Sequence, residues 1–424
     1  MNLLLVSIAF PPKRDAESLQ VAKYFSALTQ LGEAEIDVVT SALPTLYMPT
    51  DEGLNHYASG YRQLVEVDFF EHRYTNFALR KLVPSLMQRP DSRFSFFRKW
   101  RSVVKSLRTP PDVIYSRSFP LSSALMAYRL ACHFDVPWVL HLSDPWTVSP
   151  IHSIAAASKW NHDAEMECFS RATAITVTSP MTAEVYAAKY PQYADKFFVY
   201  PNVYEAHLAI RNPWKRRDKL RFVYTGGLIG TRSPVLLLAA LVMLEKLHPE
   251  MRQDIEVVFA GPVDRANAAL LADNSRQVRY LGDRSMHDAL QEQRNADVLL
   301  LIDSAFSDPS QAMFFPSKLL DYVAAERRVI GITDQHSMTW EVMGRLGLGD
   351  RIPHGNTQAL CDALVVAWHA WTRADSQYFE RTVRTEDYEA AFNAQRLMKL
   401  FRSLGNGKDA AGVRVQVTTE AKQV

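Results

Sequence analysis

The sequence predicts an α/β protein of two Rossmann-like, doubly wound parallel-sheet domains that face a cleft. Short apolar runs rich in β-branched residues alternate with helical patterns along most of the chain, which is typical of strand–helix–strand units in a parallel sheet. The alternation stops at a polar, basic stretch, residues 211–218, and then begins again. A chain of 424 residues, 47% of them hydrophobic, can form two cores.

The first domain is expected to span residues 1–201 and to contain six strands. The runs that predict them are 3–7, 36–40, 112–115, 138–141, 174–178 and 197–200. Helical patterns lie between these runs, among them 17–31, 121–134 and 181–190. Ligands of doubly wound sheets bind at the carboxyl ends of the strands, so the residues after each run are candidates for a site.

The second domain is expected to span residues 202–385 and to repeat this pattern. The apolar runs that predict its strands are 220–225, 255–260, 278–281, 298–302 and 329–332. An amphipathic crossover helix, 386–404, is expected to return to the first domain. The remaining residues, 405–424, lack the apolar content of a core and are expected to be disordered.

Composition excludes several classes of protein. The 48 Lys and Arg residues nearly balance 46 Asp and Glu, which excludes a strongly basic nucleic-acid coat and an acidic solvating protein. Cys132, Cys168 and Cys361 are too far apart for a disulfide framework or a Cys-rich zinc site. No secretory signal is expected, and the longest apolar stretch, 235–244, is shorter than the roughly 20 residues of a bilayer crossing. We therefore expect a cytoplasmic protein.

A glycine-rich turn is the sharpest local signal of the second half. A predicted strand runs into Gly226 and Gly227. A helix is then expected to open with Ser233 as its N-cap and Pro234 at its first position. Glycines let a ligand approach the backbone, a helix start offers N–H groups to a phosphate, and Arg232 adds positive charge. The turn indicates either a phosphate site or a plain strand–turn–helix connection.

The segment 315–325 is the second signal. Pro316 and Ser317 are expected to start a helix, on which Lys318 and Asp321 share one face. A cation at a helix start can neutralise a diphosphate, and a carboxylate one turn later can accept hydrogen bonds from ribose hydroxyls. The alternative is an exposed salt bridge on an ordinary amphipathic helix.

Taken in order, these segments resemble the glycosyltransferases of family 4 and their GT-B relatives. The resemblance covers about residues 1–400. Besides the two signals above, the matching motifs are 3–12, 111–116, 136–146, 199–202 and 259–262. The resemblance implies a GT-B fold with an acceptor-side first domain and a second domain that binds a nucleotide-diphospho-sugar.

The resemblance also implies roles for residues of the second domain. Arg232 corresponds to the family's basic residue on the donor diphosphate. The helix start at Pro316, Ser317 and Lys318 would hold the phosphates or the sugar, and Asp321 stands where a Glu usually binds the ribose.

Further donor contacts are implied in two turns. Gly226 and Gly227 form the glycine turn of the donor domain. The turn 282–284 follows a strand, so that Arg284 and its neighbours would contact the base through their backbone.

In the first domain, His141 and Arg117 fall at strand ends where the family places sugar-contacting and catalytic-side residues. Asp144 lies close behind His141 and is assigned to the acceptor side. His141 could equally be a satisfied core residue, and the segment around Asp144 could be a turn with an aromatic plug. The acidic residues of 163–167 are most simply solvated charges of a helix.

The sequence departs from the family pattern at three places. Met313 occupies the position of the first glutamate of the family's glutamate pair, Asp15 and Ala16 replace a Gly-Gly loop, and Gly227 stands where an Arg is usual. These departures favour the rival interpretation, a non-catalytic GT-B subunit that binds a sugar or a partner protein. An epimerase on the same fold is a third option.

The chain contains no Asp-x-Asp, so a divalent metal held by paired carboxylates is not suggested. Arg232, Lys318 and two helix N-termini would stabilise the leaving diphosphate instead. The sequence thus predicts a metal-independent sugar transferase without a cofactor besides its donor. By family resemblance, it would retain the anomeric configuration and act on a glycan or lipid-linked acceptor in bacterial surface polysaccharide or glycolipid assembly.

Residues 73–108 depart from overall neutrality, with ten Lys or Arg and a single acid, Asp91. Within them, aromatic and basic residues of 91–108 alternate with helical spacing. Such a segment predicts peripheral contact with an anionic membrane surface, here the inner face. The alternative is a core-packed helix with a solvated basic back. No RNA- or DNA-binding module accompanies the patch, so no nucleic-acid partner is expected.

Overall fold

The computed structural model describes residues 1–43, 45, 48–148, 158–206, 213–273, 277–305, 312–313, 315–383 and 385–405. The expected disordered tail lies outside these residues from position 406 on, as does the start of the polar stretch 211–218. The chain divides into two compact units. The first is Met1–Val203 with the segment that begins at Asp387, and the second is Tyr204–Glu386.

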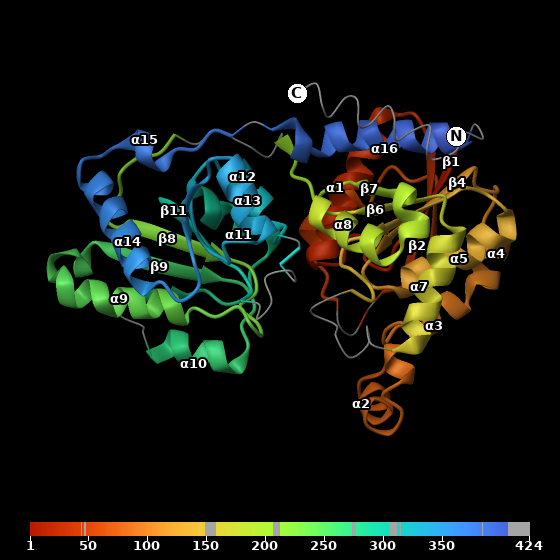
Figure 1. Cartoon of the computed structure of the whole chain (residues 1–424), viewed down its shortest axis with the longest axis horizontal. Helices are drawn as coiled ribbons and strands as arrows, with labels where there is room; N and C mark the ends of the chain where they lie inside the picture. The colour runs from red at the N-terminus through yellow and green to blue at the C-terminus, as the bar shows by residue number, and fades with distance from the viewer. Residues whose placement is uncertain are drawn as a thin grey trace. The chain divides into compact units, whose positions relative to one another are not determined.

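The first unit is built on a seven-stranded parallel sheet in the order β3-β2-β1-β4-β5-β6-β7 (Figure 1). Its strands are β1 (Asn2–Val6), β2 (Glu35–Ser41), β3 (Gln63–Val67), β4 (Val113–Ser118), β5 (Trp138–Leu142), β6 (Ala174–Val177) and β7 (Phe197–Val199). Leu4 and Val6 belong to one buried cluster, whereas Leu3 and Leu5 belong to another. Both faces of the sheet are therefore covered, which explains why its central strands are continuous apolar runs.

Helices supply the cover on both faces (Figure 1). The helices of the first unit are α1 (Ala16–Leu31), α2 (Arg73–Leu82), α3 (Ser95–Arg98), α4 (Trp100–Ser106), α5 (Ser122–Phe134), α7 (Lys159–Arg171), α8 (Pro180–Lys189) and α16 (Ala390–Gly405), of which α2 does not cover the sheet (Figure 1). Leu397 and Phe401 of α16 are buried in the same cluster as Leu28 of α1 and Leu5 of β1. The C-terminal helix therefore packs on the first unit, as the sequence predicts.

The second unit contains a six-stranded parallel sheet in the order β10-β9-β8-β11-β12-β13. Its strands are β8 (Leu220–Thr225), β9 (Ile255–Ala260), β10 (Val278–Tyr280), β11 (Val298–Ile302), β12 (Arg328–Ile332) and β13 (Gly349–Ile352). Its helices are α9 (Val235–Leu247), α10 (Arg265–Asp273), α11 (Met286–Arg294), α12 (Lys318–Ala324), α13 (Met338–Arg345), α14 (Thr357–Thr372) and α15 (Ser376–Phe379). Two parallel-sheet α/β units confirm the predicted fold class.

Two edge strands, β3 and β13, are additional to the predicted ones. Polar residues interrupt both: β3 contains Gln63 and Glu66, and β13 contains Asp350 and Arg351. An edge strand pairs on one side only and can remain polar. It therefore lacks the continuous apolar run that marks the central strands.

Two predicted helix starts differ by one residue or more. Pro234 is the N-cap of α9 and not its first helical residue, and the side chain of Ser233 accepts only a long hydrogen bond, 3.4 Å, from the backbone N of Val235. Helix α12 begins at Lys318, after Ser317.

The segment 91–108 forms two short helices, α3 and α4, that meet at Lys99. Phe96 is buried, and Phe97 and Trp100 pack against the first unit's core. The exposed side chains of the segment include its basic ones, Arg98, Lys99, Arg101 and Lys105. The structure thus matches the alternative of core packing, because the aromatic side chains expected to enter a membrane face the protein interior.

Glu165 corrects the expectation that the acidic residues of 163–167 are solvated. It is fully buried on α7 and accepts hydrogen bonds from the backbone N of Thr147 at 3.0 Å, the Tyr186 hydroxyl at 3.0 Å and the Tyr190 hydroxyl at 2.6 Å. A buried carboxylate requires such donors. Glu165 therefore anchors the loop that follows β5.

A second buried polar group lies at the ends of β4 and β5. Arg117 forms an ion pair with Glu17 at 3.1 Å and lies 4.7 Å over the ring of Tyr24. His141 Nδ1 is 2.9 Å from Thr176 Oγ1. Burial lowers the pKa of His141 well below its ordinary value, and the positive charge of Arg117 lowers it further. The folded protein thus keeps this imidazole neutral.

We predict that His141 makes the protein less stable in mild acid. Below the ordinary histidine pKa of about 6.5, His141 binds a proton in the unfolded chain but not in the folded protein. Its contribution to the free energy of unfolding is therefore fully present above that pH and is lost as the pH falls. At pH 5.5 the loss should be roughly 1.4 kcal/mol, because one pH unit corresponds to that free energy. Urea unfolding at pH 7.5 and 5.5 measures it.

The loss on acidification should shrink in His141→Asn, whatever that variant's stability at pH 7.5. His287→Asn, at an exposed position on α11, is the control and should lose as much as the wild type. Equal acid losses in wild type and His141→Asn would contradict the prediction.

Candidate active site

The topology of the second sheet creates a crevice between β8 and β11. Strand β8 lies between β9 and β11, so the connections that follow β8 and β11 leave toward opposite sides. Ligands of open α/β sheets bind outside the carboxyl ends of the strands at such a switch point. The residue that follows β8 is Gly226, and the residue that follows β11 is Asp303.

The glycine turn is closely packed by its neighbours. Gly226 has a φ of +109°, and a Cβ atom there would lie 2.7 Å from the Nζ atom of Lys318. Gly261, after β9, has a φ of +136°, and a Cβ there would lie 2.5 Å from the carbonyl oxygen of Gly226. Both positions therefore require glycine. A Cβ at Gly227 would meet only ordinary contacts.

Tyr224 joins the glycine turn to α12. The Nζ atom of Lys318 donates a hydrogen bond of 2.6 Å to the Tyr224 hydroxyl, which donates one of 2.8 Å to the carbonyl of Gly227. The same Nζ atom lies 4.0 Å from the centroid of the Tyr224 ring. The structure thus brings together two motifs that lie some ninety residues apart in the sequence.

Helix α10 holds the loop that carries Arg232. Asn267 donates hydrogen bonds to the carbonyls of Leu228 at 3.0 Å and Arg232 at 3.1 Å, and Asp264 accepts one of 3.0 Å from the backbone N of Gly230. The side chain of Arg232 is half-buried, and its Nε has no hydrogen-bond partner among the residues that the structure describes. The backbone is thus fixed while the guanidinium keeps a buried donor available.

The electrostatics around Lys318 and Arg232 favour binding of an anion. Burial lowers the pKa of Lys318 well below its ordinary value, and the charge of Arg232 lowers it further, against the opposing effect of Asp303. Burial raises the pKa of Asp303, which accepts hydrogen bonds from Thr333 and Thr339. Two cationic side chains therefore converge at the switch point, where a phosphate could neutralise both.

The other predicted donor residues lie around this centre. Pro316 is buried and precedes α12, Ser317 caps it, and Asp321 is half-buried one turn further on. Met313, at the position of the family's first glutamate, is buried.

The turn 282–284 follows β10, and its Arg284 is exposed. The carbonyl of Gly282 accepts a hydrogen bond of 2.9 Å from the backbone N of Gly261, which ties this turn to the loop after β9. Within the described residues no three His, Cys, Asp or Glu side chains are grouped to hold a metal ion.

Sequence reasoning missed Tyr224, Asp303 and Asn267. Asp303 could have been found, because it directly follows a predicted strand at a switch point. Tyr224 and Asn267 carried no signal, since their roles depend on contacts with Lys318 and Arg232 that only the folded chain reveals.

The residues predicted for the first unit are less accessible. Arg117 is fully buried against Glu17, which places it in the interior and not on an acceptor-facing surface. His141 is also fully buried, and its Nε2 has no hydrogen-bond partner among the described residues. Asp144 is half-buried in the loop after β5.

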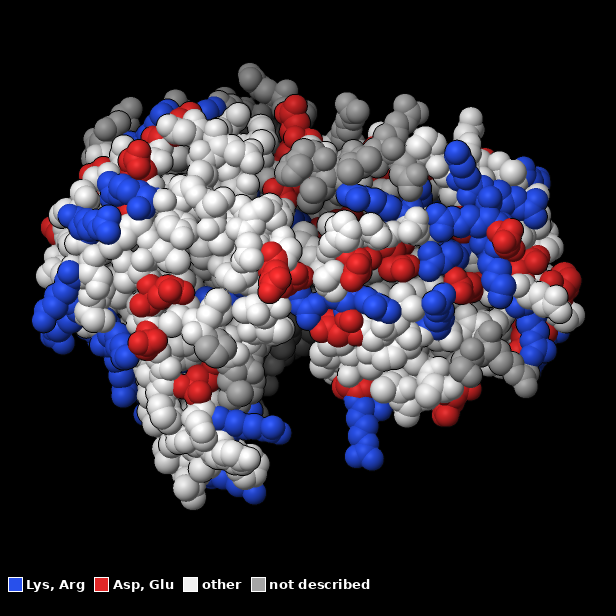
Figure 2. Space-filling model, turned by 180° about the vertical axis from the view of Figure 1, so that it is seen from behind, with Lys and Arg blue, Asp and Glu red and all other residues white. Residues whose placement is uncertain are grey.

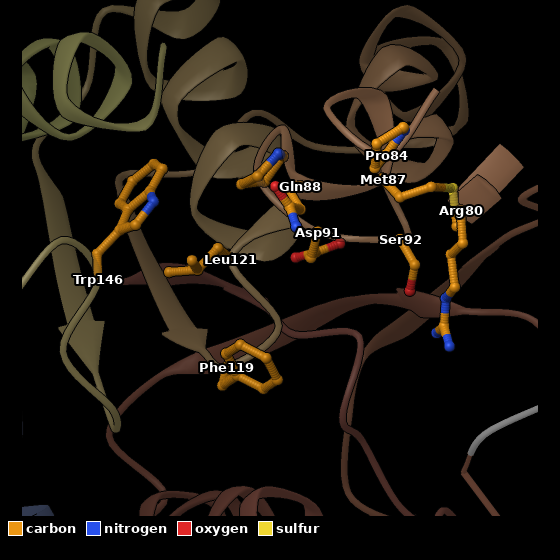
Figure 3. A pocket seen from close by; sticks show the side chains of 10 residues that line it. Arg80, Pro84, Met87, Gln88, Asp91, Ser92, Phe119, Leu121 and Trp146 are labelled. Carbon is orange, nitrogen blue, oxygen red and sulfur yellow. The ribbon is translucent and has the colours of Figure 1, made fainter. Parts of the chain in front are cut away.

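A cavity of about 370 Å³ lies nearby, at the carboxyl ends of β4 and β5. Figure 3 shows Asp91 and Gln88 at its centre, Trp146 and Phe119 toward the strands, and Arg80 on the opposite side. Asp91 is held by the backbone N and hydroxyl of Ser122, at 2.9 and 2.8 Å. The cavity therefore combines apolar walls with a few fixed polar groups, as ligand sites do.

Comparison with known proteins identifies the first unit. The sequence profile of the glycosyl transferase 4-like domain matches residues 19–202. No curated protein sequence matches the chain significantly.

Solved structures resemble the whole chain at low sequence identity. HepE of Anabaena, in complex with UDP and glucose, is 15% identical with a TM-score of 0.56, over 100% of this chain and 99% of HepE. Sucrose-phosphate synthase of Thermosynechococcus elongatus is 14% identical with a TM-score of 0.59, over 100% and 98%. A putative UDP-N-acetylglucosamine 2-epimerase of Listeria monocytogenes is 13% identical with a TM-score of 0.62, over 97% and 98%. The first unit therefore contains a glycosyl transferase 4-like domain, and the whole chain shares the GT-B fold of these structures.

Proposed function

We propose that this glycosyltransferase takes its sugar from a nucleotide-diphospho-sugar bound at the β8–β11 switch point. The electrostatic influence of Arg232 on Lys318 at this switch point carries the proposal, because two basic side chains that act on one site suit the two phosphates of such a donor. UDP fits this role, since HepE was solved in complex with UDP and glucose. The acceptor is a glycan or a lipid-linked glycan, in bacterial surface polysaccharide or glycolipid assembly at the inner face of the membrane.

The proposed reaction requires charge stabilisation on the leaving group. The bond between the anomeric carbon and the diphosphate oxygen breaks, and the diphosphate keeps the electron pair. The acceptor hydroxyl bonds to the anomeric carbon, with retention of configuration, and its proton passes to the departing diphosphate oxygen. Arg232 and Lys318 stabilise the charge that develops on the leaving oxygen. The cavity beside Asp91 and Trp146 is the acceptor side in this proposal.

We predict that Lys318→Met and Arg232→Met each lower turnover by on the order of 10²-fold, the usual effect of removing a preorganised electrostatic donor. The double variant should lose less than the product of the two, because both side chains act on one diphosphate. Release of UDP from a panel of UDP-sugars, with water as acceptor, measures the rate.

Lys246→Met, at an exposed position on α9, is the matched control and should keep the wild-type rate. A wild-type rate in Lys318→Met would exclude the assignment. Binding of UDP- and GDP-sugars without any release of nucleotide, over a wide acceptor panel, would instead support a non-catalytic subunit.

We also predict that binding of UDP is coupled to proton uptake. The free protein holds the pKa of Lys318 far below its ordinary value, and a neighbouring diphosphate would raise it again. Affinity should therefore decrease as the pH rises through the lowered pKa. Calorimetry in buffers of different ionisation enthalpy would detect the uptake, and its persistence in Lys318→Met would contradict the assignment of the proton to Lys318.

Metal removal should leave activity largely intact, because in this proposal two side-chain cations replace a divalent ion. Release of UDP after treatment with EDTA measures this. A loss that added Mg²⁺ or Mn²⁺ restores would contradict the mechanism.

A further inference from the structure

Large exposed apolar side chains gather on one segment of the first unit, residues 70–83. Their exposed fractions are 53% for Phe70, 77% for Tyr74, 61% for Phe77, 79% for Leu82 and 43% for Val83. Solitary exposed apolar residues are normal on a protein surface, but a group of five within one short segment marks an interaction site.

The segment is built as a projection from the first unit. Asn76 is the only buried residue of α2 within the described chain, and α2 packs against the following 3-10 turn, η2 (Leu86–Gln88). Figure 1 shows α2 clear of the sheet, at the lower edge of the unit. A helix that exposes apolar side chains in this position is available to a partner and does not serve the core.

Apart from Glu71, the charged side chains of residues 70–83 are basic. Arg73, Arg80 and Lys81 are exposed, and residues 72–90 contain no Asp or Glu. The nearest acid, Glu71, lies 3.7 Å from Arg93. Figure 2, from behind, shows the projection at the lower left as mostly uncharged surface, with Lys and Arg side chains toward its tip and acidic side chains nearer the body of the unit.

We propose that residues 70–83 dock the protein on the interface of an anionic lipid membrane. Aromatic and leucine side chains flanked by Lys and Arg suit that interface, since the rings enter the headgroup region while the cations meet anionic lipids. The nitrogen of Lys81 lies 4.8 Å from the centre of the Phe77 ring, so an apolar and a basic contact with the membrane would form at the same place. Such attachment is peripheral; among the described helices, none has the length and apolarity to cross a bilayer.

The projection lies beside the cavity that the proposed function assigns to the acceptor, so the role of the membrane contact rests on that proposed function. Arg80, Pro84 and Met87 of the α2–η2 segment line the cavity on the acceptor side. A membrane that binds α2 would thus lie next to this cavity, within reach of a lipid-linked acceptor. The segment 91–108 presents mainly basic charge, because Phe96, Phe97 and Trp100 are packed against the core.

Co-sedimentation of the full chain with vesicles tests the proposal. Wild-type protein should sediment with phosphatidylcholine vesicles that contain about one third phosphatidylglycerol, and much less with phosphatidylcholine alone, because the basic residues require anionic lipid. Salt should weaken the binding without abolishing it, since the apolar contribution is not screened. Tyr74→Ser with Leu82→Ser should lower the partition coefficient about tenfold or more, and Arg73→Glu with Lys81→Glu should do the same.

Two matched controls should bind like the wild type. Leu247→Ser removes a single exposed apolar side chain, 57% exposed, from the second unit. Arg98→Glu with Lys99→Glu reverses charge on 91–108. Melting temperatures verify that each variant is folded, and release of UDP in the absence of vesicles measures donor chemistry separately, so failure of the docking proposal is distinct from failure of the proposed function.

The proposal is overturned if wild-type protein stays in the supernatant with anionic vesicles at low salt. It is also overturned if the Tyr74/Leu82 variant sediments normally, or if the 98/99 variant alone loses binding. Sedimentation velocity without lipid provides the last check. Self-association that disappears in the Tyr74/Leu82 variant, without any binding to vesicles, would assign the surface to contact between copies of the chain.

Discussion

Both units depend on one constraint, the burial of a parallel sheet on its two faces. Leu3 and Leu5 face one buried cluster while Leu4 and Val6 face another, so no side of the central strands is left for chemistry. Polar and charged groups are therefore confined to the ends of the strands and the loops beyond them. Because parallel strands end at the same edge, residues far apart in sequence meet there, and reversal of the strand order beside β8 opens space for a ligand.

The proposed donor site needs few contacts besides the arrangement of strand ends that burial of the sheet imposes. Gly226 is favoured because its φ of +109° is one that L side chains rarely adopt, and the end of Lys318 lies where a Cβ would be. Tyr224 accepts from Lys318 and donates to Gly227, and thereby sets the distance between α12 and the turn. Asn267 fixes the loop of Arg232 through backbone carbonyls alone. These contacts thus fix the position of Lys318 and of the loop that carries Arg232, which is the preorganisation that electrostatic catalysis requires.

The sequence predicts the features that a local residue pattern determines, and it does not predict those that depend on packing between distant segments. Central strands such as 220–225 and 298–302 were predictable because burial on both faces makes them continuously apolar. The edge strands β3 and β13 were not, since polar residues interrupt them. The motifs of Arg232 and Lys318 predict a donor site, which stays a prediction, whereas Glu165 was misjudged as solvated because its partners, Tyr186 and Tyr190, lie on another part of the chain. The helical spacing in 91–108 likewise carried no information on which side the aromatic rings would face.

The proposed donor site is also where the protein departs from what stability alone would select. Burial of Lys318 beside Arg232 disfavours the charged amine, and the buried Nε of Arg232 has no hydrogen-bond partner among the described residues. Both features cost free energy in the unliganded protein. Elsewhere in the second unit, buried or half-buried arginines are paired, as Arg328 is with Asp350 at 2.9 Å. An incoming anion would accept a hydrogen bond from Arg232 and favour the charged form of Lys318, so its binding would offset both costs at once.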